Sequence, residues 1–273
     1  MTRSILLWLL GACVFACPCR AQTVDEVIAK NLAARGGIEK LRAIRSMTVT
    51  AQLATPGGGG GPLTVRLMRP GRIQEDLTMG GVETIRTFDG RSGWVLTRKT
   101  GAEDVQVLAG GDAENLRDEG ENGIDGALAD YRKKGNSVAL EGAAVLPDGK
   151  LCYKLKVRLR SGHLQFQYLD TQSFLEVREE IVRTFNGKET QIEETVGDYR
   201  SVGGVLFAHT FVSGLAGSAQ KTTLSIEKIE LNPPTDEGQF RMPRAGGGRG
   251  AGLYPDFQPV ALPGKKGWAA RNT

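Results

Sequence analysis

Apolar and polar residues alternate strictly along residues 151–159 of the chain. The apolar positions are Leu151, Tyr153, Leu155, Val157 and Leu159, and the positions between them are Cys152, Lys154, Lys156 and Arg158. A period of two is that of a β-strand, because successive side chains of a strand point to opposite faces. This segment therefore predicts a strand with one apolar face and one basic face.

The same alternation recurs along most of the chain. It is found in the segments 47–53, 63–67, 73–77, 82–88, 94–96, 164–168, 174–182, 190–196, 205–212 and 222–231. Turn sequences separate many of these segments, namely Pro70-Gly71, Gly80-Gly81, Asp89-Gly90, Ser161-Gly162, Asn186-Gly187 and Gly203-Gly204. Short strands joined by such turns predict an antiparallel meander of roughly ten strands.

Helical spacing is found in three places. Thr23 and Glu26 have the pattern of a capping box, and the apolar residues that follow keep helical spacing until Gly36-Gly37. A second, short helix is expected over residues 38–44. Residues 112–134 are polar and acidic but keep some apolar residues at helical spacing, which predicts one irregular helix.

These elements predict a mainly β fold with a helical lid, of the α+β class. A sheet of this size with one apolar face must curve, and its concave side must be covered or filled, for which the helices are available. The segment from Pro56 to Pro62 holds five glycines between two prolines. It lacks the Gly-Lys-Ser/Thr that follows a phosphate-binding loop, so we interpret it as a mobile hairpin loop.

Residues 1–21 have the pattern of a signal peptide. Arg3 precedes an apolar run that is too short to span a bilayer comfortably, and Ala21 supplies a small residue at the cleavage site. We expect cleavage after Ala21 and export to the periplasm. Cys13 and Cys17 each follow a lipobox-like sequence, so a lipid anchor in the outer membrane is the alternative.

The remaining chain divides into a domain and a tail. Residues 22–243 can bury one sizeable core and are expected to form a single domain. Residues 244–273 are rich in Gly, Arg and Pro and are expected to be a disordered tail. The formal net charge of the chain is +4, and removal of the signal peptide would take away the positive charges of Arg3 and Arg20. The mature chain would then be only mildly basic, which argues against nucleic acid as a partner.

Side chains for catalysis are scarce. Of the two histidines, His163 lies beside a predicted turn and His209 within a predicted strand. Cys152 lies within a strand of alternating residues, where a lone cysteine is usually a small buried side chain. The pairs Glu179-Glu180 and Glu193-Glu194 lie on strands, where neighbours point to opposite faces, so we interpret them as solvated strand residues rather than acid–base pairs. We expect no catalytic residue, no metal site, no cofactor and no enzymatic activity.

Several segments resemble the outer-membrane lipoprotein-sorting superfamily, the LolA/LolB-like proteins. They are Ala33–Leu41, Phe88-Asp89-Gly90 before Gly93-Trp94, Tyr153-Lys154-Leu155 with Tyr168-Leu169-Asp170, and Asp198-Tyr199 before Gly203-Gly204-Val205. The resemblance runs from Thr23 to Pro243. It implies an unclosed half-barrel whose helices cover an apolar cavity that takes acyl chains.

The resemblance also directs the choice of a binding site. Six side chains are the candidates to line the apolar cavity: Trp94, Tyr153, Leu155, Val157, Phe166 and Tyr168. Burial at about 0.8 kcal/mol per methylene would supply the affinity without a catalytic group.

We therefore expect a monomeric, non-enzymatic cell-envelope protein that binds lipid or lipoprotein acyl chains and carries them. The alternative is a periplasmic sensor or scaffold that uses the same fold to bind envelope proteins. Peripheral contact with a membrane is compatible with both.

Overall fold

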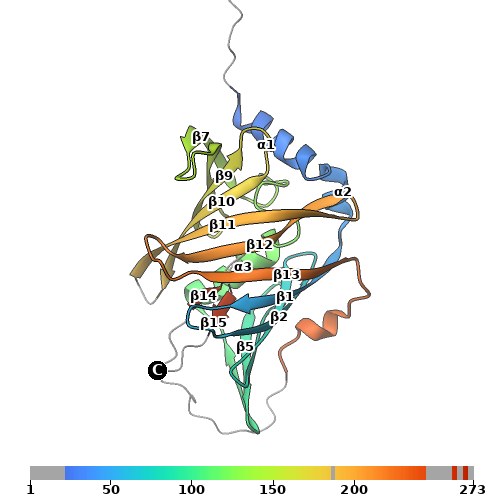
Figure 1. The fold of residues 1–273 in the computed structure, drawn as a ribbon. Helices are drawn as coiled ribbons and strands as arrows, with labels where there is room; N and C mark the ends of the chain where they lie inside the picture. The colour runs from blue at the N-terminus through green and yellow to red at the C-terminus, as the bar shows by residue number, and fades with distance from the viewer. Residues whose placement is uncertain (1–21, 186–187, 244–259, 263–266, 270–273) are drawn as a thin grey trace, which may run out of the picture.

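Thirteen strands of the chain form one antiparallel sheet in the computed structural model, which describes residues 22–185, 188–243, 260–262 and 267–269 (Figure 1). The strands are β1 Ser46–Ala54, β2 Gly60–Met68, β3 Arg72–Met79, β4 Val82–Phe88, β5 Gly93–Lys99, β6 Ala102–Val107, β7 Ser137–Val145, β8 Leu151–Arg158, β9 Leu164–Asp170, β10 Glu176–Phe185, β11 Lys188–Val202, β12 Val205–Leu215 and β13 Thr222–Leu231.

The helices are α1 (Val24–Ala34), α2 (Ile38–Ala43), α3 (Gly110–Asn122) and the 3-10 turn η1 (Glu237–Phe240). The capping box at the start of α1 is confirmed. The Glu26 amide donates to Thr23 Oγ1 at 3.3 Å, and the Thr23 amide donates to Glu26 Oε2 at 2.8 Å. These bonds satisfy amide donors that the first helical turn leaves without a partner.

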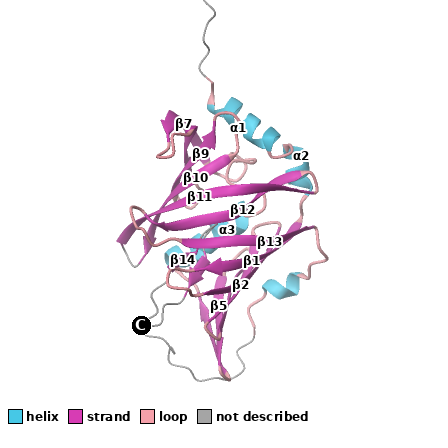
Figure 2. Cartoon of the chain, viewed as in Figure 1, coloured by secondary structure: helices cyan, strands magenta, loops and turns pink. Residues whose placement is uncertain are grey.

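The sheet is unclosed. Its strand order is β6-β5-β4-β3-β2-β1-β13-β12-β11-β10-β9-β8-β7, so every ladder joins consecutive strands except β1 with β13. Strands β6 and β7 lie at the two edges. Figure 2 shows the strands as one curved sheet, with α1 and α2 at one end and α3 against its middle. The predicted open sheet with a helical cover is confirmed.

Two details of the predicted elements were wrong. The irregular helix over residues 112–134 is instead α3, which ends at Asn122, followed by turns over residues 123–135. Gly126 has φ +82 and Asp130 has φ +50, backbone conformations that a helix cannot contain. Strands β6 and β7 were also missed, because their alternation is weak and β7 carries a register shift between Leu140 and Gly142.

The glycine-rich loop is shorter than predicted, because its second half belongs to the sheet. Strand β2 begins at Gly60, and Gly61 pairs with Leu53 of β1. A Cβ at Gly61 would lie 1.9 Å from the carbonyl oxygen of Thr78, so only glycine fits this approach of the backbones.

The two faces of the sheet differ in what covers them. The inner, concave face packs on α1, on α3 and on residues 123–135, which we call the lid. The main apolar cluster of this face joins α2 and α3 to several strands through Leu41, Leu67, Leu116, Phe207 and Ile229. The outer face is covered near β3 to β5 by η1, where Gln74 Nε2 donates to the Gln239 carbonyl at 2.9 Å.

Some predicted segments lie outside the described residues. They are the signal peptide over residues 1–21, the Asn186-Gly187 turn and most of the tail over residues 244–273. Within the tail, β14 (Val260–Leu262) and β15 (Gly267–Ala269) pair with each other. In the described parts, no helix has the length and apolar character needed to cross a membrane.

Candidate functional site: the cavity under the lid

A cavity of about 150 Å³ lies between the inner face and the lid. Its wall draws on strands from both halves of the sheet, because the sheet curves around it. The apolar lining residues are Met47, Val49, Leu63, Val65, Leu67, Ile73, Ile124, Ala127, Leu128, Val196, Leu206, Phe207, Ala208, Phe211, Leu224, Ile226 and Ile229. Alternation explains most of this composition, since a strand sends every second side chain inward, but on β12 the consecutive residues Leu206, Phe207 and Ala208 all line the cavity.

Four polar residues line the cavity where α1 meets the lid and strands β10 and β11, namely Asn31, Arg35, Glu176 and Tyr199. Arg35 Nη1 donates to the Asp125 carbonyl at 2.7 Å, and Asn31 Nδ2 donates to the Phe174 carbonyl at 2.7 Å. The Tyr199 hydroxyl donates to the Glu176 carbonyl at 2.9 Å. Burial lowers the pKa of Arg35 and raises the pKa of Tyr199 from their ordinary values. Both groups sit in a poorly hydrated wall.

A second polar part of the lining comes from the sheet and α3. Glu75, Glu119 and Gln167 all line the cavity. Glu75 accepts a hydrogen bond from Arg86 Nη1 at 2.9 Å, and both side chains of this pair are buried. The cavity is therefore amphipathic rather than purely apolar.

The polar side extends across the inner face beyond the cavity. Glu179 and Glu194 lie directly opposite each other on β10 and β11, and they are 6% and 3% exposed. The interpretation of both glutamate pairs as solvated strand residues was therefore wrong for one member of each pair. Their neighbours Glu180 and Glu193 lie on the outer face, because adjacent strand residues point to opposite sides.

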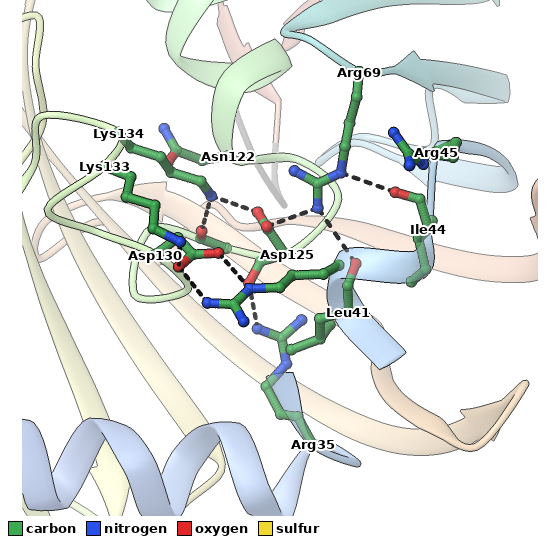
Figure 3. Close-up of polar contacts among 12 residues, drawn as sticks. Arg35, Leu41, Ile44, Arg45, Arg69, Asn122, Asp125, Asp130, Lys133 and Lys134 are labelled. Atoms are coloured by element: carbon green, nitrogen blue, oxygen red, sulfur yellow. Dashed lines mark hydrogen bonds and ion pairs between the residues drawn. The ribbon is translucent and has the colours of Figure 1, made fainter. Parts of the chain in front are cut away.

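The lid is held in place by ion pairs at Asp125 (Figure 3). The Asp125 side chain is 2% exposed and forms ion pairs with Arg69, at 2.7 Å, and with Lys134. Arg69 Nε also donates to the Ile44 carbonyl at 2.8 Å, at the end of α2. A buried carboxylate needs such partners to offset its lost hydration. Asp125 thus joins the lid to the connection between β2 and β3.

A second attachment lies nearer the surface, at Asp130. Arg42 of α2 donates to both carboxylate oxygens, at 2.9 and 2.7 Å, and Lys133 lies 3.1 Å away. The hydrogen bonds from Arg42 hold the pKa of Asp130 well below its ordinary value. The lid is therefore joined to α2 as well as to the sheet.

An apolar groove lies on the other side of the lid. It has a volume of about 570 Å³ and lies between α1, α2 and the lid, where Ile28, Leu32, Ile38 and Tyr131 contribute to its lining. Leu128 lines both this groove and the cavity. One side chain of the lid thus lies between the two spaces.

None of the six candidate side chains from the sequence is among the residues that line the cavity. Leu155 and Val157 point to the same face as the cavity but are fully buried in a cluster with Val27 and Leu128. Tyr153 packs beside this cluster, and its ring stacks on Phe174 with centroids 5.7 Å apart. Ligand contact by these three residues remains a prediction.

The other three candidates lie on the outer face. Phe166 and Tyr168 share that face with Lys154, whose Nζ lies 4.4 Å and 5.6 Å from their ring centroids. Trp94 Nε1 donates to the Phe240 carbonyl at 3.4 Å, beneath η1. The structure therefore separates the six residues into an inner group and an outer group.

The cavity residues that sequence reasoning missed come mostly from β1, β2, β12 and β13. Their alternation was visible, but it does not show which strands a curved sheet brings opposite the lid. Arg35 could have been noticed, because it ends an amphipathic helix immediately before the Gly36-Gly37 stop.

The remaining candidates for chemistry are placed as follows. His163 Nδ1 lies 2.7 Å from Asp118 Oδ2 at the β8–β9 turn, and His209 Nδ1 lies 3.0 Å from the Phe207 carbonyl. Cys152 is buried, and burial raises the pKa of its thiol. In the described ranges, no three His, Cys, Asp or Glu side chains are grouped so that they could hold a metal ion.

Two solved structures share this arrangement of strands and helices. A DUF1329 family protein from Desulfovibrio piger matches with a TM-score of 0.53 at 11% identity, over 81% of this chain and 98% of that chain. A LolA superfamily protein from Nitrosomonas europaea matches with a TM-score of 0.51 at 13% identity, over 81% of this chain and 99% of that chain. The chain has a LolA-like fold.

The LolA-like fold agrees with the resemblance seen in the sequence. No protein-family model matches the chain, and no curated protein matches it either. At 11–13% identity the likeness establishes the LolA-like fold alone, so the ligand must be argued from the cavity.

Proposed function

We propose that this chain is a non-enzymatic envelope protein that takes up an apolar chain under its lid and carries lipid or lipoprotein acyl groups. The observation that carries the proposal is the pair of apolar spaces, one under the lid and one outside it, with Leu128 lining both. A concave, mostly apolar site with a few polar groups is typical of ligand pockets.

The volumes indicate how much of a ligand the closed protein can hold. An apolar cavity of about 150 Å³ accommodates a molecule of roughly the size of benzene. A long acyl chain therefore needs the groove as well, or a lifted lid. No strand ladder holds the lid, which is attached by ion pairs and by the apolar packing of residues such as Leu128, so its movement would break no ladder.

Binding is tested with N-phenyl-1-naphthylamine, an uncharged dye that fluoresces in apolar sites, and with 1-decanol as competitor. We expect saturable fluorescence that decanol abolishes. The Val65→Trp variant fills the cavity from β2 and should reduce dye binding at least about tenfold, because the ligand loses the volume that Trp occupies.

The matched control is Val212→Trp, which adds the same ring to the outer face of β12. Dye binding should be unchanged in this variant. The proposal would be contradicted if both variants lost dye binding equally, or if the unaltered chain showed no saturable dye binding.

Purification of the protein from native envelopes distinguishes lipid carriage from the sensor or scaffold alternative, because the molecules that copurify differ. Mass spectrometry should find acyl chains in near-stoichiometric amount. A stoichiometric protein partner without lipid would favour the alternative.

We also propose that the mature chain begins at Gln22 and resides in the periplasm. Sequencing of the mature N-terminus should find Gln22 without lipid. A diacylated Cys13 or Cys17 would instead show a membrane anchor.

A further inference from the structure

Strand β7 leaves one side of its backbone unpaired in the described chain. It ends the sheet and pairs only with β8, and Figure 1 shows it at the rim of the sheet. Among the described residues, no group outside the ladder with β8 forms a hydrogen bond to the backbone of residues 137–140. Such an edge offers a row of N–H and C=O groups to a further strand.

The two edges of the sheet differ in how they hinder such pairing. The edge strand β6 carries the charged residues Glu103 and Asp104, and charges on an edge disfavour the addition of a strand. The first four residues of β7, Ser137–Leu140, include no charge, glycine or proline. They pair in regular register with residues 155–158, and the register shift comes only after them. This part of β7 is therefore open to a partner strand.

The two faces of this edge differ in their surroundings. Val138 and Leu140 point inward and pack against the apolar cluster that includes residues of α1 and the lid. Ser137 and Ala139 point outward and are exposed. A strand added here would therefore continue the sheet with its outer face toward solvent.

Two cations of β8 lie beside the edge on this outer face. Lys156 pairs with Ala139, and Arg158 pairs with Ser137. Their neighbours on the other side, in β9, are apolar. Neither cation has an ion pair within the described chain, where the side chain of Arg158 donates only to a backbone carbonyl. The outer face beside β7 thus carries two positive charges without an acidic partner.

These charges can reach past β7. Neighbouring strands lie 4.7–4.9 Å apart, so a strand added to β7 would lie roughly 9.5 Å from β8. The small side chains of Ser137 and Ala139 leave the space between the two strands open. Lys156 and Arg158 can therefore meet acidic side chains of the added strand, at two positions that alternate along it.

We propose that the edge of β7 binds an extended segment of a partner protein as a fourteenth strand of the sheet, and that this segment carries acidic residues at two alternating positions facing Lys156 and Arg158. Backbone hydrogen bonds supply the affinity, and the two charges select the partner and its register. This interaction goes beyond the proposed function, because it needs no ligand in the cavity.

The test uses a fluorescein-labelled peptide, Thr-Val-Glu-Val-Glu-Val-Thr, whose binding to the full mature chain is measured by anisotropy. It should bind at least about fivefold more tightly than the same peptide with Gln in place of both Glu, and added salt should reduce this advantage. A third peptide keeps both Glu but is methylated at two adjacent central backbone nitrogens. It should not bind, because it cannot pair with the edge.

Two variants assign the preference to the edge of β7. Lys156→Gln should weaken binding of the Glu peptide about two- to fivefold and leave the Gln peptide unchanged. Ala139→Glu gives Lys156 an acidic neighbour within the chain and should abolish the preference for Glu. The matched control is Lys228→Gln, which removes an exposed cation from β13 in the middle of the sheet and should change neither peptide.

Hydrogen exchange locates the bound peptide. Amides of residues 137–140 should exchange more slowly when the Glu peptide is bound. The proposal is overturned if the Glu and Gln peptides bind equally, if the methylated peptide binds as well as its parent, or if no peptide binds. Dimers of the chain that Ala139→Glu abolishes would identify a second copy as the occupant and would also overturn it. None of these measurements depends on dye binding, so the proposed function is tested separately.

Discussion

Arg69 and Asp125 form an ion pair, with 2.7 Å between Nη2 and Oδ2, that ties the connection of β2 and β3 to the lid. The same guanidinium donates to carbonyl oxygens of Leu41 and Ile44 at the end of α2. One arginine of the β2–β3 connection therefore contacts two other segments, the lid and the end of α2. This contact is one of those that hold the lid against the sheet, together with the Arg42–Asp130 ion pair.

Removing the charge of Asp125 should loosen the lid. Asp125→Asn leaves Arg69 and Lys134 without their carboxylate, so we expect a loss of about 1–3 kcal/mol in the free energy of unfolding, measured in urea. Amides of residues 123–135 should exchange hydrogen faster. Asp148→Asn, at an exposed turn, is the control and should change neither quantity.

Asp130 should make stability depend on acid pH. Its pKa is lowered in the folded chain from an ordinary value of 3.8, so its contribution is fully present above that value and is lost as pH falls from about 4 toward the lower folded pKa. The difference in melting temperature between the unaltered chain and Asp130→Asn should shrink from pH 5 to pH 2. A constant difference would show that the Arg42 contact does not act in solution.

Leu128→Ala should speed ligand uptake. Shortening the one side chain that lines both apolar spaces should connect them, so the association rate of the dye in stopped-flow measurements should rise several-fold. Stability should fall by about 2–5 kcal/mol, as for other buried leucines. Leu159→Ala, in the same apolar cluster but lining neither space, should lose stability without the gain in rate.

Leu155→Glu should unfold the chain. Leu155 is fully buried against α1 and the lid, where a carboxylate would have neither water nor a partner. Circular dichroism should show the loss of the β spectrum at 25 °C. A folded variant that no longer binds the dye would instead show that Leu155 lines the ligand cavity, as the sequence analysis predicted.

Truncation should distinguish the tail from the segment before it. Ending the chain after Pro243 should leave the melting temperature within a few degrees, because Phe240 is retained. Ending it after Asp236 removes Phe240, which is fully buried and accepts the Trp94 hydrogen bond, and should cost about 3–5 kcal/mol. Equal loss in both truncations would show that the tail packs on the domain.

The sequence predicted the fold well because its signal is local. The alternation of residues 151–159 and the Gly203-Gly204 turn predict a strand and a hairpin without any knowledge of distant contacts. Strand β7 was missed for the same reason, because Gly142 interrupts its alternation.

The site could not be predicted in the same way. A period of two predicts that Leu155 and Phe166 each lie on the apolar face of a strand. It does not show that these two residues lie on opposite sides of the sheet formed by β8 and β9. That depends on register: Lys154 pairs with Tyr168, and Leu155 with Gln167. A shift by one residue would have turned Phe166 inward and Gln167 outward.

The single ladder between β1 and β13 has a consequence for how the chain folds. It pairs Met47 with Leu231, whereas every other ladder joins strands adjacent in sequence. Hairpins can form early and locally, but this junction must wait for the largest loop closure in the domain. During synthesis β1 is made long before its partner, and its apolar residues then border an unpaired edge open to aggregation. Assembly of the half-barrel is thus completed by the last strand of the sheet to be synthesised.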